Sequence, residues 1–311
     1  MRRACHNMIH ELVRRDSRVI FLGSDLGPGT LDGLKKEFPS RFFMEGVAEQ
    51  NLIGVAAGLA LEGFIPYVNT IATFLTRRCL EQITLDLCLQ NLPVRLIGNG
   101  GGLVYAPQGP THMAVDDLGL MRLQPNMTVV SPADADEMRR FMEQTLAWPG
   151  PIYVRLGKGG DPVVSRAEDP FVIGQAIPLR QGNDATLIAT GVVVNRALKA
   201  AELLEEEEGV SCGVLNMHTL KPLDTAAILA LAKHSPLLVT LEEHSRIGGL
   251  GSAVADTLMD AFPSPLPRLV RLGLPDAFPE GYGSQDALMD RYGLQPLHIV
   301  NAVLDHLPTR R

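Results

Sequence analysis

The chain has few of the residues that mark disulfide-stabilised, zinc-binding or nucleic-acid-binding proteins. Its 311 residues include four cysteines, at positions 5, 79, 88 and 212, with no Cys-x-x-Cys spacing. Cysteines scattered in this way are typical of reduced thiols in a cytoplasmic protein rather than of a disulfide framework or a zinc site. Lysine and arginine total 28 against 35 acidic residues, and the resulting net charge of −7 argues against non-specific nucleic-acid binding.

The sequence also lacks an uninterrupted apolar run of membrane-spanning length. Residues 51–68 come closest, but Glu62 and glycines at positions 54, 58 and 63 interrupt them. A buried helix that runs into a strand is therefore favoured there. The basic start, Met1-Arg2-Arg3, leads into polar residues rather than into the apolar region of a signal peptide, so we expect no leader.

Common nucleotide and metal motifs are missing as well. The glycine-rich residues 98–102 lack the GxGxxG spacing of a dinucleotide loop, and no GxxxxGK[ST] sequence occurs. Residues 248–251 are interpreted as a strand-to-helix turn with close backbone packing. Asp116 and Asp117 have no histidine at metal-ligand spacing, so we expect no metal site within this chain.

Short apolar runs alternate with amphipathic helical windows along most of the chain. Residues 19–22 are a continuous apolar run closed by Gly23, as expected of a buried parallel strand. The alternation is lost near residues 166–182, which are rich in glycine, proline and charge, and then restarts. We predict two consecutive α/β domains, residues 1–165 and 183–311, each with a mainly parallel sheet flanked by helices, joined by a linker at 166–182.

Glu49 lies where a turn opens into a long apolar helix rich in glycine and alanine. An isolated glutamate there is most simply a helix-start carboxylate that the helix dipole favours. However, the dozen residues that follow are uncharged, and desolvation by apolar packing favours the protonated form of a carboxyl. A proton-sharing carboxyl is what a ring nitrogen of an aminopyrimidine requires.

Four further side chains are candidates for chemistry. Phe74 is either a core aromatic or a ring that stacks on a planar heterocycle. Arg77 and Arg78 form a solvated face or offer a guanidinium group to a phosphate. His112 follows Gly109-Pro110-Thr111 in a loop after a strand, where functional residues concentrate, although a lone histidine is more often structural. The second half contains no obvious nucleophile–base pair, so we interpret it as a structural and assembly domain.

Together these motifs resemble the transketolase family, in the portion that holds its pyrimidine-binding and C-terminal domains. The resemblance spans nearly the whole chain. It rests on the order of Gly23-Ser24-Asp25-Leu26, Gly46-Val47-Ala48-Glu49-Gln50, Pro66 through Thr73-Phe74, Gly109-Pro110-Thr111-His112, Lys221-Pro222-Leu223-Asp224, and Glu242-Glu243-His244 before Gly248-Gly249-Leu250-Gly251. Thr73-Phe74-Leu75 with Arg77 looks especially like the deoxyxylulose-phosphate synthase branch.

The resemblance implies a role for each matching residue in an enzyme that depends on thiamine diphosphate. Glu49 matches the glutamate that bonds the pyrimidine ring and promotes its imino tautomer, and Phe74 matches an aromatic of the pyrimidine pocket. His112 matches the catalytic histidine that contacts the hydroxyls of the ketose donor. The remaining matches are to substrate contacts: Arg155 to an arginine that grips the sugar phosphate, Arg77 to an assisting group, and Asp25 and Arg2 to nearby positions.

The sequence departs from the family pattern in three places. Ile71 stands where an aromatic is common, so one wall of the pyrimidine pocket is expected to be aliphatic. Gln108 stands where an aspartate is usual, which puts the sugar specificity in doubt. The Gly-Asp-Gly…Asn segment that binds the diphosphate and Mg²⁺ is missing. By resemblance to split transketolases, we expect a separate N-terminal-type subunit to supply it, in an α2β2 heterotetramer of the cytoplasm.

The leading hypothesis is therefore the C-terminal subunit of a transketolase that moves a two-carbon ketol unit from a ketose phosphate to an aldose, as in pentose phosphate metabolism. A β-type subunit of a 2-oxo acid dehydrogenase shares the two-domain plan, but the Gly109-Pro110-Thr111-His112 loop favours transketolase. An enzyme like deoxyxylulose-phosphate synthase is a further alternative. The last alternative is a non-catalytic assembly subunit, which has no need to retain Glu49, Phe74 and His112 together.

Overall fold

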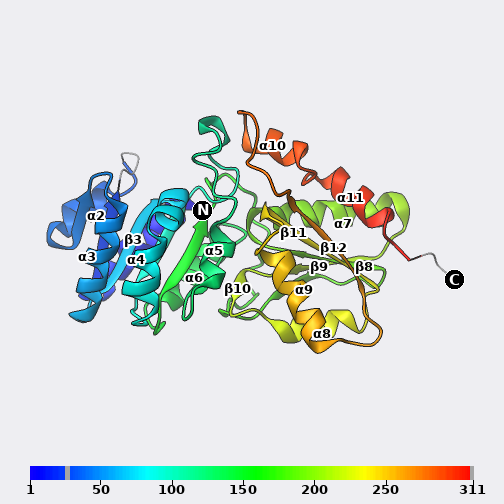
Figure 1. Cartoon of the computed structure of the whole chain (residues 1–311), viewed down its shortest axis with the longest axis horizontal. Coiled ribbons are helices and arrows are strands. Elements are labelled where there is room, and N and C mark those ends of the chain that lie inside the picture. Colours follow the sequence, from blue (N-terminus) through cyan, green and yellow to red (C-terminus); the bar gives the residue numbers. More distant parts are fainter. Residues whose placement is uncertain (25–28, 309–311) are drawn as a thin grey trace.

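The computed structural model describes residues 1–24 and 29–308, which form two sheets placed one after the other along the chain (Figure 1). The first sheet has seven strands in the order β10-β5-β6-β4-β3-β1-β2. All its neighbours pair in parallel except β10 and β5. Its strands are β1 (Val19–Ser24), β2 (Phe42–Glu45), β3 (Ile65–Ile71), β4 (Arg95–Asn99), β5 (Thr128–Val130), β6 (Ile152–Leu156) and β10 (Thr219–Lys221).

Helices cover both faces of this sheet, and its central strands β1, β3, β4 and β6 are therefore almost entirely buried. In β1, Val19 and Phe21 belong to the core on the face of α1 and α6, whereas Ile20 and Leu22 belong to the core on the face of α3. Such a strand has a continuous apolar sequence, as predicted. The helices are α1 (Arg2–Arg15), α2 (Asp32–Glu37), α3 (Glu49–Leu61), α4 (Leu80–Gln82), α5 (Asp117–Leu123) and α6 (Ala135–Thr145).

The second sheet has five strands in the order β12-β11-β8-β9-β7, and all pairs are parallel except β7 and β9. Its strands are β7 (Ile177–Arg180), β8 (Ala185–Ala189), β9 (Cys212–Asn216), β11 (Leu237–Ser245) and β12 (Arg268–Leu274). Its helices are α7 (Val194–Glu208), α8 (Thr225–Ala232), α9 (Leu250–Ala261), α10 (Gln285–Arg291) and α11 (Pro296–Leu304). The predicted fold class, two mainly parallel α/β sheets with flanking helices, is confirmed.

Several elements differ from the sequence-based expectation. β7 lies inside the range predicted as a linker, because a four-residue antiparallel edge strand that contains Pro178 carries little periodic signal. Between β3 and β4, two π-helical turns, η2 (Phe74–Arg78) and η3 (Ile83–Cys88), flank the short helix α4. Strand β10 comes from the second half of the chain but extends the first sheet.

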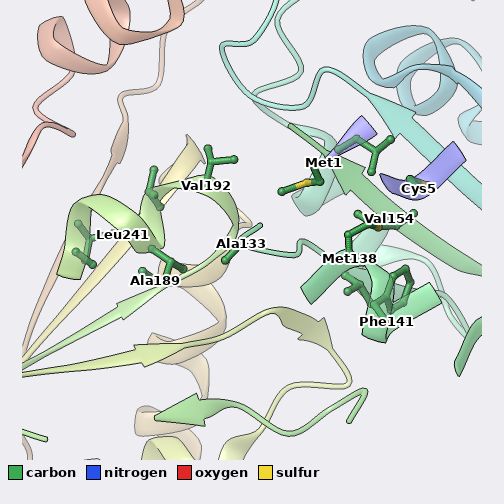
Figure 2. Packing of buried hydrophobic residues seen from close by; sticks show 14 of the residues in the cluster. Met1, Cys5, Ala133, Met138, Phe141, Val154, Ala189, Val192 and Leu241 are labelled. Atoms are coloured by element: carbon green, nitrogen blue, oxygen red, sulfur yellow. The ribbon is translucent and has the colours of Figure 1, made fainter. Parts of the chain in front are cut away.

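The two halves share one continuous apolar core in addition to β10. Figure 2 shows Met1, which precedes α1, and Cys5 of α1 beside Val154 of β6 and Met138 of α6, with Ala133 between them and the second sheet. On the far side of Ala133 lie Ala189, Val192 and Leu241. Since the same buried cluster includes residues of both sheets, the halves pack as one body rather than as independent modules.

A buried carboxyl also joins the halves. Glu137, in the first turn of α6, accepts hydrogen bonds from the backbone N–H of Ala133 (2.5 Å) and from Nδ2 of Asn216 in β9 (2.7 Å). Burial raises the pKa of Glu137 to about 7. The start of α6 is capped by Asp134, whose side chain accepts from the N–H groups of Asp136 and Glu137.

Replacing Phe141 of α6 by alanine should lower the free energy of unfolding by about 3–5 kcal/mol, because the ring is fully buried in the shared core. Denaturant or thermal unfolding measures this loss. Leu123→Ala is the matched control, since Leu123 is 76% exposed and its truncation should change little. Equal destabilisation by both substitutions would contradict the packing described here.

The stability of the Glu137→Gln variant, relative to that of the wild type, should increase as the pH rises. The carboxyl ionises near pH 4.5 in the unfolded chain but near pH 7 in the folded chain, so folded protein loses stability relative to unfolded protein as the pH rises between these values. Glutamine does not titrate. The melting temperature of the variant relative to wild type should therefore rise up to about pH 7 and then level off. A difference that is constant with pH would contradict the shifted pKa.

Candidate active site

The candidate residues gather where the parallel strands of the first sheet end. Ser24 and Ile71 are the last residues of β1 and β3, and Asn99, the last residue of β4, is the register partner of Ile71. Glu49 follows the end of β2 by four residues and begins α3. In open α/β sheets, ligands bind outside the carboxyl ends of the strands, so this edge is the expected place for a site.

Glu49 is buried at this edge, with 2% of its surface exposed. Ser24 Oγ donates to Glu49 Oε1 (3.2 Å) and to the carbonyl oxygen of Gly46 (2.9 Å), which ties the end of β1 to the turn before α3. Arg78 Nη1 donates to Glu49 Oε2 at 2.5 Å, so a guanidinium group compensates the buried carboxylate. The sequence placed Glu49 among apolar groups and did not foresee this cation.

Phe74 and Arg78 are the two ends of the π-helical turn η2, and Arg78 contacts the Glu49 carboxyl. The Arg78 guanidinium lies 4.5 Å from the centre of the Phe74 ring, within cation–π range. The His112 ring meets the same phenyl ring edge-on, with 5.1 Å between ring centres. The structure therefore brings Glu49, Arg78, Phe74 and His112 into one chain of contacts. π-helical turns are frequent at functional sites.

A second polar cluster, formed by His6, Asn69 and Asn99, involves the ends of β3 and β4. Asn69 of β3 donates to His6 Nε2 (2.5 Å), and Asn99 donates to the side-chain oxygen of Asn69. His6 Nδ1 lies 3.0 Å from the Thr30 hydroxyl. Burial, with a smaller contribution from the charge on Arg2, lowers the pKa of His6 to about 4, so this imidazole is neutral near pH 7. The side-chain oxygen of Asn99 is buried and has no partner among the described residues.

Arg77 precedes Arg78 in η2 but forms its hydrogen bonds with residues other than Glu49. Its Nε donates to both carboxylate oxygens of Asp116 (2.8 and 3.1 Å), and Nη2 donates to the carbonyl oxygen of Met113. Two surface clefts meet at Arg77. One, of about 530 Å³, is also lined by Gln50 and Arg78, and the other, of about 310 Å³, by Asp116 and Phe278. Arg77 is therefore accessible from solvent, as its predicted substrate role requires.

Arg155 occupies a different position from the one its predicted phosphate-binding role suggests. It is 6% exposed and forms a two-pronged ion pair with Asp117 (2.7 and 3.0 Å). Its other hydrogen bonds go to the carbonyl oxygens of Glu243 and Ala114. The phosphate contact was implied by the resemblance to the transketolase family, in which an arginine at the matching position grips the sugar phosphate. Here the guanidinium is used inside the chain, at the junction between the halves.

The other predicted contacts are placed as follows. Ile71 is half-buried and contributes an aliphatic wall at the end of β3. Arg2 lies in the first turn of α1, one turn before His6, and is half-buried. Asp25 lies outside the described residues. None of the described residues forms a cluster of ligands that could hold a metal ion, and none of the described helices is long and apolar enough to cross a membrane.

Sequence reasoning missed the polar residues that line the strand ends. Asn69 carries a readable signal, because an amide inside the apolar run Tyr67-Val68-Asn69-Thr70 needs a partner. Arg78 was considered only as a solvated or phosphate-binding group, and its pairing with Glu49 depends on the π-helical turn. No pattern in the sequence predicted that π-helical turn.

Comparison with known proteins agrees with this architecture. Residues 1–160 match the model of the transketolase pyrimidine-binding domain, and residues 174–299 match that of the transketolase C-terminal domain. The chain therefore belongs to the transketolase family.

Two curated relatives match over nearly their whole length. The 6-deoxy-6-sulfo-D-fructose transketolase subunit SqwH of Clostridium sp. (strain MSTE9) is 39% identical over 95% of this chain and 91% of its own length. An apulose-4-phosphate transketolase subunit of Phocaeicola vulgatus is 35% identical over 98% of this chain and 96% of its own length. A 1-deoxy-D-xylulose-5-phosphate synthase of Synechococcus sp. is 40% identical, but the match spans 43% of that enzyme.

Among solved structures, a split-gene transketolase described as an inactive β4 tetramer superposes with a TM-score of 0.91. It is 39% identical, and the match covers 100% of this chain and 99% of that one. A transketolase of Pichia stipitis shares the fold, with a TM-score of 0.77 at 17% identity over 45% of its chain.

Replacing Arg155 by methionine should destabilise the fold, because it leaves the buried Asp117 carboxylate without its cation, at a loss of about 3–5 kcal/mol. Arg77→Met is the control, since a half-exposed ion pair contributes only about 0–1 kcal/mol. Thermal unfolding separates the two. If Arg155→Met keeps the wild-type melting temperature and only weakens substrate binding, the phosphate-binding prediction is right and the structural role is wrong.

Proposed function

We propose that this chain is the C-terminal subunit of a thiamine diphosphate-dependent transketolase, which transfers a two-carbon ketol unit from a ketose phosphate to an aldose or aldose phosphate. The observation that carries the proposal is the buried Glu49 carboxyl in contact with Arg78, beside Phe74 and His112, in a chain of the transketolase family. In the same proposal, residues 1–165 form the thiamine-pyrimidine-binding unit and residues 183–311 the C-terminal domain.

The residues present fit the pyrimidine half of the cofactor. Glu49 offers a buried carboxyl whose two oxygens contact only Ser24 and Arg78 among the hydrogen bonds of the described residues. Phe74 offers a half-buried aromatic ring, and Arg78 contacts both this ring and the carboxyl. Arg78 lies over that ring, keeps its ion pair with Glu49, and is 41% exposed in its side chain. When bound, thiamine diphosphate supplies the nucleophilic thiazolium carbon that carries the ketol unit.

Each residue of this chain has a distinct part in that reaction. Glu49 would hydrogen-bond a ring nitrogen of the bound pyrimidine, and Ser24 and Arg78 hold its carboxyl at the start of α3. Phe74 and Ile71 exclude water from the ring. His112, half-buried at the outer edge of Phe74, is placed to donate or accept hydrogen bonds with sugar hydroxyls. Arg77, which opens onto two clefts, is placed to bind an anionic group of the substrate.

The diphosphate and a divalent cation such as Mg²⁺ are assigned to a partner, an N-terminal-type transketolase subunit, in an α2β2 assembly. The outward face of α3 supports association with another protein. Between Glu49 and Glu62 this helix has no charged residue, yet Gly54, Val55, Gly58 and Leu61 are all exposed. An exposed uncharged helix face with small residues suits close helix packing better than contact with water. The β4 assembly of the similar split-gene transketolase agrees with self-association.

A second candidate function is that of an enzyme like deoxyxylulose-phosphate synthase, which decarboxylates pyruvate. The 40% identity to one such synthase favours it. Gln108 lies in the exposed turn before the Gly109-Pro110-Thr111-His112 loop and is the residue to vary when the two are compared. Assays of the reconstituted complex with ketose phosphates and with pyruvate as donors separate the two candidates, and ketol transfer without pyruvate decarboxylation is expected.

Glu49→Gln should lower ketol transfer by the reconstituted complex by about 10²- to 10⁴-fold, the usual contribution of a positioned proton-transfer group. The amide keeps the shape of the side chain but cannot share a proton with the pyrimidine. The measurement is steady-state transfer from a ketose phosphate to an aldose phosphate with saturating thiamine diphosphate and Mg²⁺.

Glu62→Gln is the matched control, because Glu62 is an exposed carboxylate at the opposite end of the same helix. It should retain wild-type activity. Subunit association, followed by size-exclusion chromatography, should be the same for both variants. Near-wild-type activity of Glu49→Gln in an assembled complex would refute the proposed role of the carboxyl.

A further inference from the structure

The loop that carries His112 is closed at its base by the backbone. We use the name His112 loop for residues 103–113. Just before it, the N–H groups of Gly100 and Gly101 both donate to the carbonyl oxygen of Leu156 (3.0 Å) at the end of β6. The N–H of Gly102 donates to the carbonyl oxygen of Ala114 (2.8 Å), which joins the two ends of the loop. The position of His112 therefore depends on what holds residues 100–103.

A side chain from the second domain holds the first residue of this loop. Glu243 of β11 accepts the N–H of Leu103 on Oε1 at 2.7 Å. The same oxygen accepts from Nε2 of Gln285 in α10 (2.8 Å). Gly102, with φ of +65°, leaves the necessary space, because a Cβ there would lie 2.4 Å from the carboxyl carbon of Glu243. The His112 loop and the second domain are thus joined at the carboxyl group of Glu243, a residue that is 3% exposed.

Arg155 strengthens the same joint from the other side. Its Nη1 donates to the backbone oxygen of Glu243 (2.9 Å), and its Nη2 donates to that of Ala114 (2.7 Å), the residue that closes the loop. One guanidinium group therefore links the strand that supplies Glu243 to the far end of the His112 loop. Both ends of the His112 loop are therefore held by hydrogen bonds that lead to Glu243 of β11: Leu103 directly, and Ala114 through Arg155.

Packing of the two domains against each other does not by itself require a carboxyl group at position 243. Burying a carboxyl is unfavourable, and burial raises the pKa of Glu243 to about 7. Replacement of a buried ion pair by apolar residues of similar volume is often neutral or stabilising, so domain packing alone does not call for a buried carboxyl. What an apolar residue cannot do is accept the Leu103 N–H and so set where the loop begins.

The neighbouring Glu242 provides a contrast on the same strand. It is equally buried, but its oxygens accept the N–H groups of Leu250 and Gly251 at the start of α9, within the second domain. Glu242 is a helix cap with no contact to the His112 loop among the hydrogen bonds of the described residues. Two adjacent buried glutamates thus face different partners.

We propose that Glu243 is a positioning residue for ketol transfer: its carboxyl, held by Gln285, anchors Leu103 and thereby sets the His112 loop against Phe74. This proposal rests on the proposed function and deepens it, because it gives the second domain a part in the site that its motifs did not suggest. Glu243 acts through His112 and contacts no substrate itself.

The test is a double-mutant cycle in the reconstituted complex with Glu243→Ala and His112→Ala. Glu243→Ala should lower kcat/KM for ketol transfer by about 10- to 100-fold, the size of effect that a displaced catalytic group produces. In the His112→Ala background the same change should lower kcat/KM by less than about threefold, because coupled residues are not additive. Glu243→Gln, whose amide oxygen can still accept from Leu103, should restore most of the activity.

Hydrogen exchange provides a readout that does not depend on activity. Peptides that span residues 103–113 should exchange faster in Glu243→Ala than in wild type, and should be unchanged in the control Glu242→Gln. If Glu243→Ala does not fold, Glu243→Asp serves instead, since its shorter side chain keeps the carboxyl but retracts it from the Leu103 N–H.

Equal losses of kcat/KM in both backgrounds, or unchanged exchange in the His112 loop, would overturn the positioning role. If the wild-type complex transfers no ketol unit but exchange of the loop still rises in Glu243→Ala, the proposed function fails while the anchoring of the loop by Glu243 stands. The two failures are therefore distinguishable.

Discussion

The candidate site depends on one interaction, the ion pair between the buried Glu49 carboxylate and the Arg78 guanidinium. A carboxylate with 2% exposure at the start of an uncharged helix is unfavourable unless it is hydrogen-bonded and its charge is compensated. Ser24 supplies a hydrogen bond and Arg78 supplies the charge. Arg78 reaches Glu49 because the π-helical turn η2 places it on the same side as Phe74. The pair therefore couples the end of β1, the start of α3 and the aromatic contact with His112.

The second constraint is the buried polar junction between the two halves. Arg155 and Asp117 belong to the first domain, Glu243 and Gln285 to the second, and their hydrogen bonds converge on the ends of the His112 loop. With the shared apolar core and strand β10, this junction keeps the domains in one arrangement. A residue that seemed suited to grip a phosphate thus contributes to the frame that holds the site.

The order of strands and helices could be read from the sequence because it is written in local patterns. The apolar run at residues 19–22 of β1 and the glycine- and alanine-rich α3 are examples. The edge strand β7 and the crossing strand β10 could not be read, since each is short and gains its stability from a distant partner. The site divides in the same way. Glu49, Phe74 and His112 were found from motifs, whereas Arg78, Asn69 and the true partners of Arg155 follow from contacts between residues far apart in sequence.

The central claim is that this chain provides the pyrimidine half of a thiamine diphosphate site and a partner provides the diphosphate half. Calorimetric titration of thiamine diphosphate and Mg²⁺ into the chain alone, and into the chain with an N-terminal-type transketolase subunit, tests it most directly. We predict weak or undetectable binding to the chain alone and tight binding to the complex, weakened by Glu49→Gln. Equally tight binding to the chain alone, or binding to the complex that is indifferent to Glu49, would contradict it.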